Sequence, residues 1–195
     1  METTKQPLIT VVMPNYNGHR FVEQAIDSVL NQTYPNFELL VVDDCSKDDS
    51  LSLIQHKAQS DKRIKVIALE HNAGVANARN VGIKEAKGEF IALLDNDDLW
   101  TEDKLERQLA LANKGADIVY CSYDFIDEQN NSIKKPFIVP QQTNFNKMLA
   151  SSVISCSTSF IKTELMQAHP FNSDFYHEDY VLWMELLRVC STAYG

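Results

Sequence analysis

The sequence predicts an α/β fold in which helices flank a mostly parallel central sheet. Short apolar runs rich in β-branched residues alternate with amphipathic stretches up to about residue 120, a pattern typical of parallel strands joined by crossover helices. The chain has 195 residues, 44% of them hydrophobic, which suffices for one sizeable core but hardly for two. We therefore expect a single, doubly wound domain.

The first five apolar runs are the expected parallel strands, at Leu8–Met13, Glu38–Val42, Ile64–Ala68, Phe90–Leu94 and Asp117–Tyr120. Apolar residues recur at three- and four-residue spacing in the expected crossover helices, Arg20–Leu30, Asp49–Ser60, Val75–Ala86 and Glu102–Lys114. Gly88 and Gly115 are expected to close two of these helices. Beyond Asp124 the pattern loosens, and we expect one more strand at Ser157–Ile161 and an amphipathic helix at Glu178–Val189.

Charge and cysteine content exclude several classes of protein. The chain has 18 basic and 27 acidic residues, a formal net charge of −9, which argues against nucleic-acid binding because that relies on clustered Lys and Arg. The cysteines are far apart and lack metal-ligand spacing; they are Cys45, Cys121, Cys156 and Cys190. The first apolar run is too short for a leader or a membrane span, so we expect a cytoplasmic protein.

Polar residues follow the first two strands, where open α/β sheets bind their ligands. The first strand runs into Pro14-Asn15-Tyr16-Asn17-Gly18, which offers an aromatic ring, amides and a glycine turn. A simple strand-to-helix turn explains this segment equally well. After the second strand, Ser46 and Asp49 have the spacing of a capping box for the next helix. Capping leaves the preceding pair, Asp43 and Asp44, unexplained.

An acidic cluster follows the fourth strand, in Asp95-Asn96-Asp97-Asp98. Three carboxylates in four residues repel one another. Near a cleft, such a cluster is best stabilised by Mg²⁺ or Mn²⁺ shared with substrate phosphates. The structural alternative is that Asp98 or Thr101 caps the following helix while the other carboxylates are solvated.

Two further segments carry charged residues beside expected helix starts. Gly74 permits a close turn, and Arg79 lies one turn into the following helix, where it could meet a phosphate, a carboxylate of the acidic cluster or a plain surface ion pair. His177-Glu178-Asp179 opens the last helix. Acidic residues there stabilise the helix dipole, and this structural role competes with catalysis by Asp179.

Taken together, these segments resemble the large inverting glycosyltransferase family two, whose catalytic domain has the GT-A fold. The segments VVMPNYNG, VVDDCSKDDS, HNAGVANARNVGIKEAKGEFIALLDNDDLW and HEDYVLWMELL fall in the family's order and approximate spacing. The ordered set is highly specific. The resemblance implies one GT-A domain over residues 1–195, cut short at its C-terminus, in which 1–124 binds the nucleotide sugar and 125–195 begins the acceptor-binding part.

The resemblance assigns roles to the residues after the first two strands. It implies that Pro14, Tyr16 and Asn17 border the nucleotide, with Tyr16 near the base. It also implies that the carboxylates of Asp43 and Asp44 help to read the base or the ribose.

In the acidic cluster the resemblance implies a DXD motif. Asp95 and Asp97 are then the expected ligands of Mn²⁺ or Mg²⁺, with Asp97 binding directly, and Asp95 and Asn96 contribute to the donor site. Arg79 falls close to the nucleotide and the motif. Asp179 matches the residue proposed as the general base that takes the proton of the acceptor hydroxyl.

The implied reaction is a single in-line displacement that inverts the anomeric carbon. The expected donor is a UDP-sugar, and the expected acceptor is a saccharide or lipid-linked saccharide in bacterial surface-polysaccharide synthesis, with peripheral association at the inner face of the cytoplasmic membrane. Cys45 stands where many members have glycine, and no QxxRW-like motif of processive synthases is present, which favours addition of one sugar per acceptor.

Three other functions compete with this interpretation. A catalytically inactive, donor-binding scaffold would share the motifs. A phosphoacceptor signalling domain would use Asp43 and Asp44 but leave the acidic cluster and Asp179 without a role. A sugar nucleotidylyltransferase would need a glycine-rich, arginine-containing loop near the N-terminus, which the chain lacks.

Overall fold

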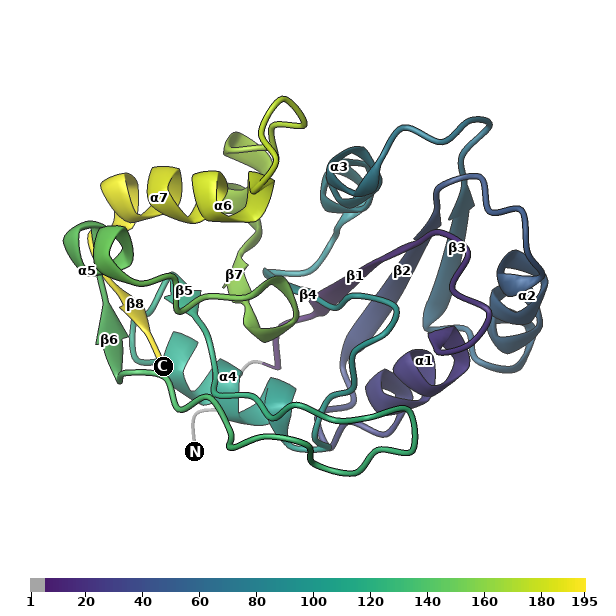
Figure 1. The fold of residues 1–195 in the computed structure, drawn as a ribbon, viewed down its shortest axis with the longest axis horizontal. Helices are drawn as coiled ribbons and strands as arrows, with labels where there is room; N and C mark the ends of the chain where they lie inside the picture. Colours follow the sequence, from purple (N-terminus) through teal and green to yellow (C-terminus); the bar gives the residue numbers. More distant parts are fainter. Residues whose placement is uncertain (1–5) are drawn as a thin grey trace.

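The computed structural model describes residues 6–195, whose centre is one eight-stranded sheet of order β3-β2-β1-β4-β7-β5-β8-β6 (Figure 1). Four neighbouring strands run parallel to one another. They are β3 (Ile64–Ala68), β2 (Phe37–Asp43), β1 (Ile9–Asn15) and β4 (Phe90–Leu93). Because β1 lies between β2 and β4, the chain crosses over in opposite directions on its two sides, as in a doubly wound fold.

The other half of the sheet is mixed and its strands are short. β7 (Phe160–Lys162) pairs antiparallel with both β4 and β5 (Ile118–Val119). β8 (Ala193–Tyr194) lies parallel to β5, and β6 (Gln142–Thr143) pairs antiparallel with β8. The predicted parallel sheet is therefore confirmed for the first four strands, and an antiparallel extension follows it.

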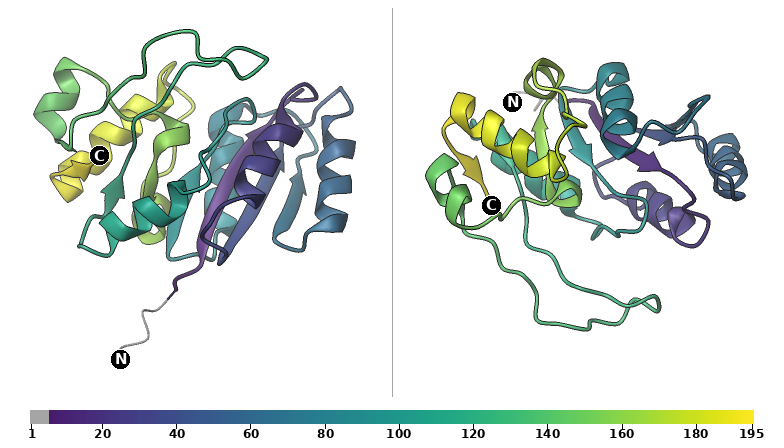
Figure 2. Two further views of the ribbon diagram at one scale, coloured as in Figure 1. Left: turned by 90° about the horizontal axis from the view of Figure 1, so that it is seen from below. Right: turned by 45° about the horizontal axis from the view of Figure 1, so that its top comes forward.

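Helices cover both faces of the sheet, as Figure 2 also shows. One core holds α1 (Val22–Leu30), α2 (Ser50–Ser60) and α4 (Lys104–Ala112). The other core holds α3 (Val75–Glu85), α5 (Phe145–Ala150), α6 (Thr163–Ala168) and α7 (Glu178–Cys190). β1 contributes to both cores because successive side chains of a strand point to opposite faces of the sheet. Val11 and Met13 belong to the first core and Val12 to the second. None of the described helices is long and apolar enough to cross a membrane.

The helix starts differ from the predicted caps. α2 begins at Ser50, whose backbone N–H donates to Asp48 Oδ1 at 3.0 Å. Asp49 occupies the N-cap position but its side chain makes no capping hydrogen bond. The Ser46 hydroxyl donates to Asp43 Oδ1 at 2.6 Å, so the predicted capping box does not form. α4 begins at Lys104 without a side-chain cap, so the capping roles considered for Asp98 and Thr101 are also wrong.

Two more local predictions can be compared with the structure. Gly115 follows α4 with φ +97°, as expected of a helix-closing glycine. Gly88 has a different role, because a Cβ there would lie 2.5 Å from the backbone N of Thr10 in β1. The strand predicted at Ser157–Ile161 begins later, since Cys156–Thr158 form a 3₁₀ turn, η1, before β7.

Candidate active site

A cleft of about 380 Å³ opens at the carboxyl ends of β1, β2 and β4. This is the topological switch point of the sheet, where open α/β folds bind ligands. Its walls are Pro14, Asn15, Tyr16, Asp44, Asn72, Gly74, Val75, Ala78, Arg79, Asp95, Asn96 and Asp97.

Most of the candidate residues come together at this cleft. Seven of them line it: Pro14, Tyr16, Asp44, Arg79, Asp95, Asn96 and Asp97. Asn17, Asp43 and Asp179 are not among the lining residues. The contacts of these three residues are described below.

The adjacent carboxylates of Asp43 and Asp44 have different surroundings. Asp43 is fully buried, and its Oδ1 accepts hydrogen bonds from Asn15 Nδ2 at 2.7 Å and from the Ser46 hydroxyl. Asp44 lines the cleft, and its two oxygens accept from the backbone N–H groups of Ala73 and Gly74, both at 2.8 Å. Asp44 therefore holds the loop before α3, whereas Asp43 belongs to the scaffold below the cleft.

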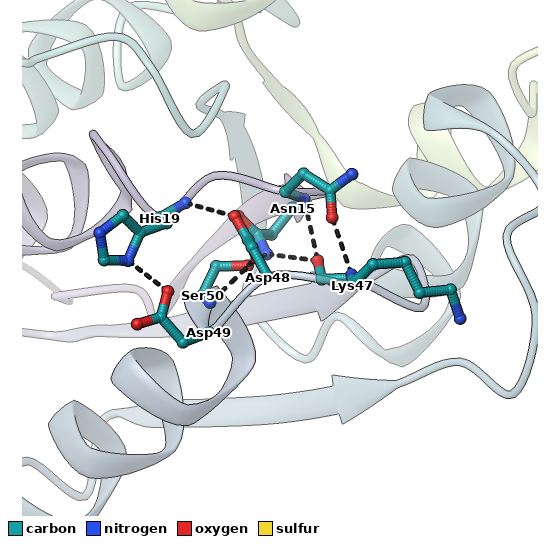
Figure 3. A network of polar contacts seen from close by, with 8 residues as sticks. Asn15, His19, Lys47, Asp48, Asp49 and Ser50 are labelled. Carbon is teal, nitrogen blue, oxygen red and sulfur yellow. Dashed lines mark hydrogen bonds and ion pairs between the residues drawn. The ribbon is translucent and has the colours of Figure 1, made fainter.

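The loops after β1 and β2 are bound to each other by a polar network (Figure 3). Asn17 Oδ1 accepts from the backbone N–H of Lys47 at 2.8 Å, and Asp48 Oδ2 accepts from the backbone N–H of His19 at 3.0 Å. Asn17 is thus a bracing residue beside the cleft. Tyr16, which the braced loop carries, is 48% exposed, so its ring is free to contact a ligand.

Cys45 in this network has φ +60°, in the left-handed region that favours glycine. The left-handed conformation costs a non-glycine residue about 1–2 kcal/mol, and glycine's greater freedom in the unfolded chain offsets part of the gain. We expect Cys45→Gly to raise the free energy of unfolding by about 1 kcal/mol and the Tm by roughly 2–4 °C. Thermal denaturation measures this change. Cys45→Ser, which keeps the strained backbone, should be no more stable than the native protein, and a serine variant as stable as the glycine variant would contradict the prediction.

Arg79 connects the acidic turn after β4 to the start of α7. Its side chain is 6% exposed, and it donates to Asp95 Oδ1 at 2.7 Å and to Glu178 Oε1 at 2.9 Å. Its guanidinium carbon also lies 5.3 Å from the centre of the Phe171 ring. The burial excludes a plain surface ion pair. Arg79 instead fixes the acidic turn against the last helix.

Negative charge remains at the acidic turn after this pairing. Within residues 6–195, no hydrogen bond or ion pair engages the carboxylate of Asp97, which lines the cleft. Desolvation raises the pKa of Asp98, and the nearby Asp95 and Asp97 raise it further, against a hydrogen bond from Ser157 that lowers it. A cation placed against this turn would relieve the repulsion.

The described residues contain no group of three or more His, Cys, Asp or Glu that could hold a metal ion alone. Mg²⁺ and Mn²⁺ sites in nucleotide enzymes commonly use one or two carboxylates, with phosphate oxygens and water completing the shell. One unengaged carboxylate, Asp97, beside the paired Asp95 fits a cation shared with a diphosphate.

Several residues that position the site escaped the sequence-based prediction. Asn15 Oδ1 accepts from Asn96 Nδ2 at 2.7 Å, which ties the end of β1 to the acidic turn. Ser157 Oγ accepts from the backbone N–H of Asp95 at 3.0 Å. Asn15 stands among the polar residues after an apolar run, a signal that could have revealed it. Ser157, 62 residues from its partner, gave no such signal.

Asp179 lies beside the cluster around Arg79. It is the second residue of α7, directly after Glu178, and its Oδ1 accepts from the backbone N–H of Tyr180 at 2.7 Å. Burial raises the pKa of the neighbouring Cys156 thiol, and Asp95, Asp179 and Glu178 raise it further while Arg79 lowers it. The charge of Asp179 therefore acts on the same buried thiol as the charges of Arg79 and Asp95.

The fold and the cleft define an α/β protein with an acidic cleft at the switch point of its sheet. The model of glycosyl transferase family 2 matches residues 10–169. The Escherichia coli protein named UDP-Glc:alpha-D-GlcNAc-diphosphoundecaprenol beta-1,3-glucosyltransferase WfgD is 41% identical over 183 residues, 93% of this chain and 70% of that protein. The putative teichuronic acid biosynthesis glycosyltransferase TuaG of Bacillus subtilis is 33% identical over 99% of this chain and 77% of its own length. The chain belongs to glycosyl transferase family 2.

Solved structures agree with the predicted GT-A fold. Residues 1–349 of S. aureus TarS in complex with UDP align with a TM-score of 0.82 and 23% identity, over 95% of this chain and 56% of that chain. The mannosyltransferase PcManGT of Pyrobaculum calidifontis, solved with GDP-Man and Mn²⁺, aligns with a TM-score of 0.77 and 21% identity, over 98% of this chain and 55% of its own. The chain thus spans little more than half of these structures. Its family excludes the signalling-domain alternative.

Proposed function

We propose that this chain is the catalytic domain of an inverting glycosyltransferase that moves a sugar from a UDP-sugar to a saccharide or lipid-linked saccharide acceptor. The observation that carries this proposal is the unengaged carboxylate of Asp97 in the cleft that also presents Tyr16 and Asp44. The acceptor class rests on the name of the E. coli relative, whose acceptor is a sugar linked through a diphosphate to a lipid. A lipid-linked acceptor would bring the protein to the inner face of the cytoplasmic membrane, as a peripheral protein of surface-polysaccharide synthesis.

The donor site divides between a base end and a diphosphate end. The exposed ring of Tyr16 offers a stacking surface for the base. Pro14 lines the same cleft, Asn17 braces the loop that carries Tyr16, and the remaining lone pairs of Asp44 would accept hydrogen bonds from the base or ribose. The diphosphate end is formed by the acidic turn after β4, whose Asp95, Asn96 and Asp97 line the cleft.

The acidic turn is suited to a divalent cation, Mn²⁺ or Mg²⁺. Asp97 and Asp95 would hold the ion together with the donor's phosphates, and the ion would neutralise charge on the departing diphosphate. Arg79 fixes Asp95 through the 2.7 Å ion pair, and Asn96 is held by Asn15. The protein's part is thus to keep the turn rigid and leave Asp97 open.

Asp179 is the proposed general base. It would take the proton of the acceptor hydroxyl as that oxygen attacks the anomeric carbon, while the bond from this carbon to the diphosphate oxygen breaks. One displacement inverts the configuration, so an α-linked donor gives a β-linked product. Arg79 and Glu178 link the start of the helix that carries Asp179 to the acidic turn.

The proposed donor site predicts metal-dependent binding of UDP. We expect UDP to bind at least about tenfold more tightly in Mn²⁺ than in chelator, a difference of about 1.4 kcal/mol, because Asp97 would share the ion with the diphosphate. Asp97→Ala should abolish that difference. Titration calorimetry measures both affinities, and Glu102→Ala, which removes an exposed acid near the same turn, is the matched control. Equal affinities of the unaltered protein in Mn²⁺ and in chelator would refute the metal site.

A further inference from the structure

A second hollow, of about 500 Å³, lies beside the donor cleft. The segment before and at the start of α3 forms one wall, and residues 173–176 with Glu178, which lead into α7, form the other; these two parts of the chain lie side by side in Figure 1. Gly74 and Val75 line both the cleft and the hollow. A ligand in the hollow would therefore approach a donor in the cleft.

Two aromatic side chains at the hollow are turned toward water. Phe175 is 50% exposed and Tyr176 is 93% exposed. The same segment places Phe171 in the core, at 4% exposure, so packing of the fold does not require the other two rings. Val75, across the hollow, is 44% exposed. Grouped apolar side chains that a fold leaves exposed mark interaction sites.

The polar residues of the hollow restrict the chemistry of its ligand. Ser173, Asp174 and Glu178 line it, and none of its lining residues is basic. Glu178 is already paired with Arg79, so we expect the carboxylate of Asp174 to repel an anionic ligand and to accept hydrogen bonds from the hydroxyl groups of a neutral sugar. The electron-rich face of an aromatic ring suits the weakly positive C–H face of a pyranose. Aromatic surface with a few polar groups is the usual composition of a small-molecule site.

We propose that this hollow is the subsite for the neutral sugar ring of the acceptor, with Tyr176 and Phe175 as its stacking surface and Asp174 as the acceptor of its hydroxyl hydrogen bonds. The inference rests on the proposed function, because Asp179, the proposed base, directly follows Glu178 in the wall of the hollow. A membrane surface is the rival occupant, and the acidic lining disfavours it because anionic lipid headgroups attract basic segments.

The test compares Phe175→Ala/Tyr176→Ala with Ile138→Ala, which removes another exposed apolar side chain, 74% exposed and outside the hollow. Saturation-transfer NMR titrations would use the methyl glycosides of N-acetylglucosamine, glucose and galactose, with UDP and Mn²⁺ present. We expect one of them to bind the unaltered protein and the control with a Kd on the order of 1 mM, and the double variant at least about tenfold more weakly. UDP affinity should be the same in all three proteins.

Each remaining outcome counts against the inference or against the function on which it rests. Equal glycoside affinity in the double variant, or no binding of any glycoside by the unaltered protein, overturns the subsite. If the double variant no longer sediments with phosphatidylglycerol–phosphatidylethanolamine vesicles but still binds the glycoside, the two rings belong to a membrane-binding surface instead. Failure of UDP to bind overturns the proposed donor site and is seen separately, because UDP is titrated alone.

Discussion

Replacing Arg79 by methionine is expected to lower the free energy of unfolding by about 3 kcal/mol and to weaken UDP binding about tenfold or more. The guanidinium is buried and pairs with Asp95 at 2.7 Å and with Glu178 at 2.9 Å. Methionine keeps much of the side-chain volume but leaves two partly buried carboxylates without a counter-charge. Asp95 is 30% exposed, so water can hydrate it in part. The loss in free energy of unfolding should therefore fall at the low end of the range for removing one partner of a buried ion pair.

Urea denaturation measures the stability change, and calorimetry with UDP and Mn²⁺ measures the binding change. Arg107→Met is the matched control, because Arg107 pairs with Asp103 at the surface, where its side chain is 77% exposed, and such pairs contribute about 0–1 kcal/mol. Arg79→Lys should fall between the two, since an ammonium is a point charge that cannot reproduce the guanidinium fork. An Arg79→Met protein as stable as the Arg107→Met protein would show that the two carboxylates do not depend on this partner.

The parallel half of the sheet could be predicted because its signal is local. Up to α4, each apolar run by itself predicts a strand and each amphipathic stretch predicts a helix. The observed bounds differ from the predicted ones by a few residues at most. In the mixed half only β5, β7 and α7 carry such a signal. β6 and β8 have two residues each, and α5 and α6 have six, too few for periodicity to appear, so their existence depends on long-range pairing.

The candidate site divides in the same way. Residues that end strands or begin helices could be predicted from the chain alone, because parallel strands bring their carboxyl ends to one edge. Asp43 and Asp44 show the limit, since neighbouring side chains at a strand end point to opposite sides and only one of them reaches the cleft. The partnership of Arg79 with Glu178 spans 99 residues, and no local spacing could have predicted it.

Replacing Asp179 by asparagine is expected to lower the rate of sugar transfer about 10²- to 10⁴-fold, the usual effect of losing a general base. Asparagine has the same shape, and its Oδ1 can still accept the hydrogen bond from the backbone N–H of Tyr180, which is 2.7 Å long in the native residue. Asparagine cannot take a proton from the acceptor. UDP affinity in Mn²⁺ should therefore stay unchanged, because Asp179 does not line the donor cleft.

Asp174→Asn is the control that separates chemistry from acceptor binding. Asp174 lines the second hollow on the same segment, so its substitution should raise the acceptor KM and leave kcat nearly unaltered, whereas Asp179→Asn should lower kcat. Steady-state rates of transfer from a UDP-sugar to a lipid-diphosphate-linked N-acetylglucosamine, measured at varied acceptor concentration, provide both constants. Transfer by Asp179→Asn at a near-native rate would return Asp179 to the structural role of an acid at a helix N-terminus.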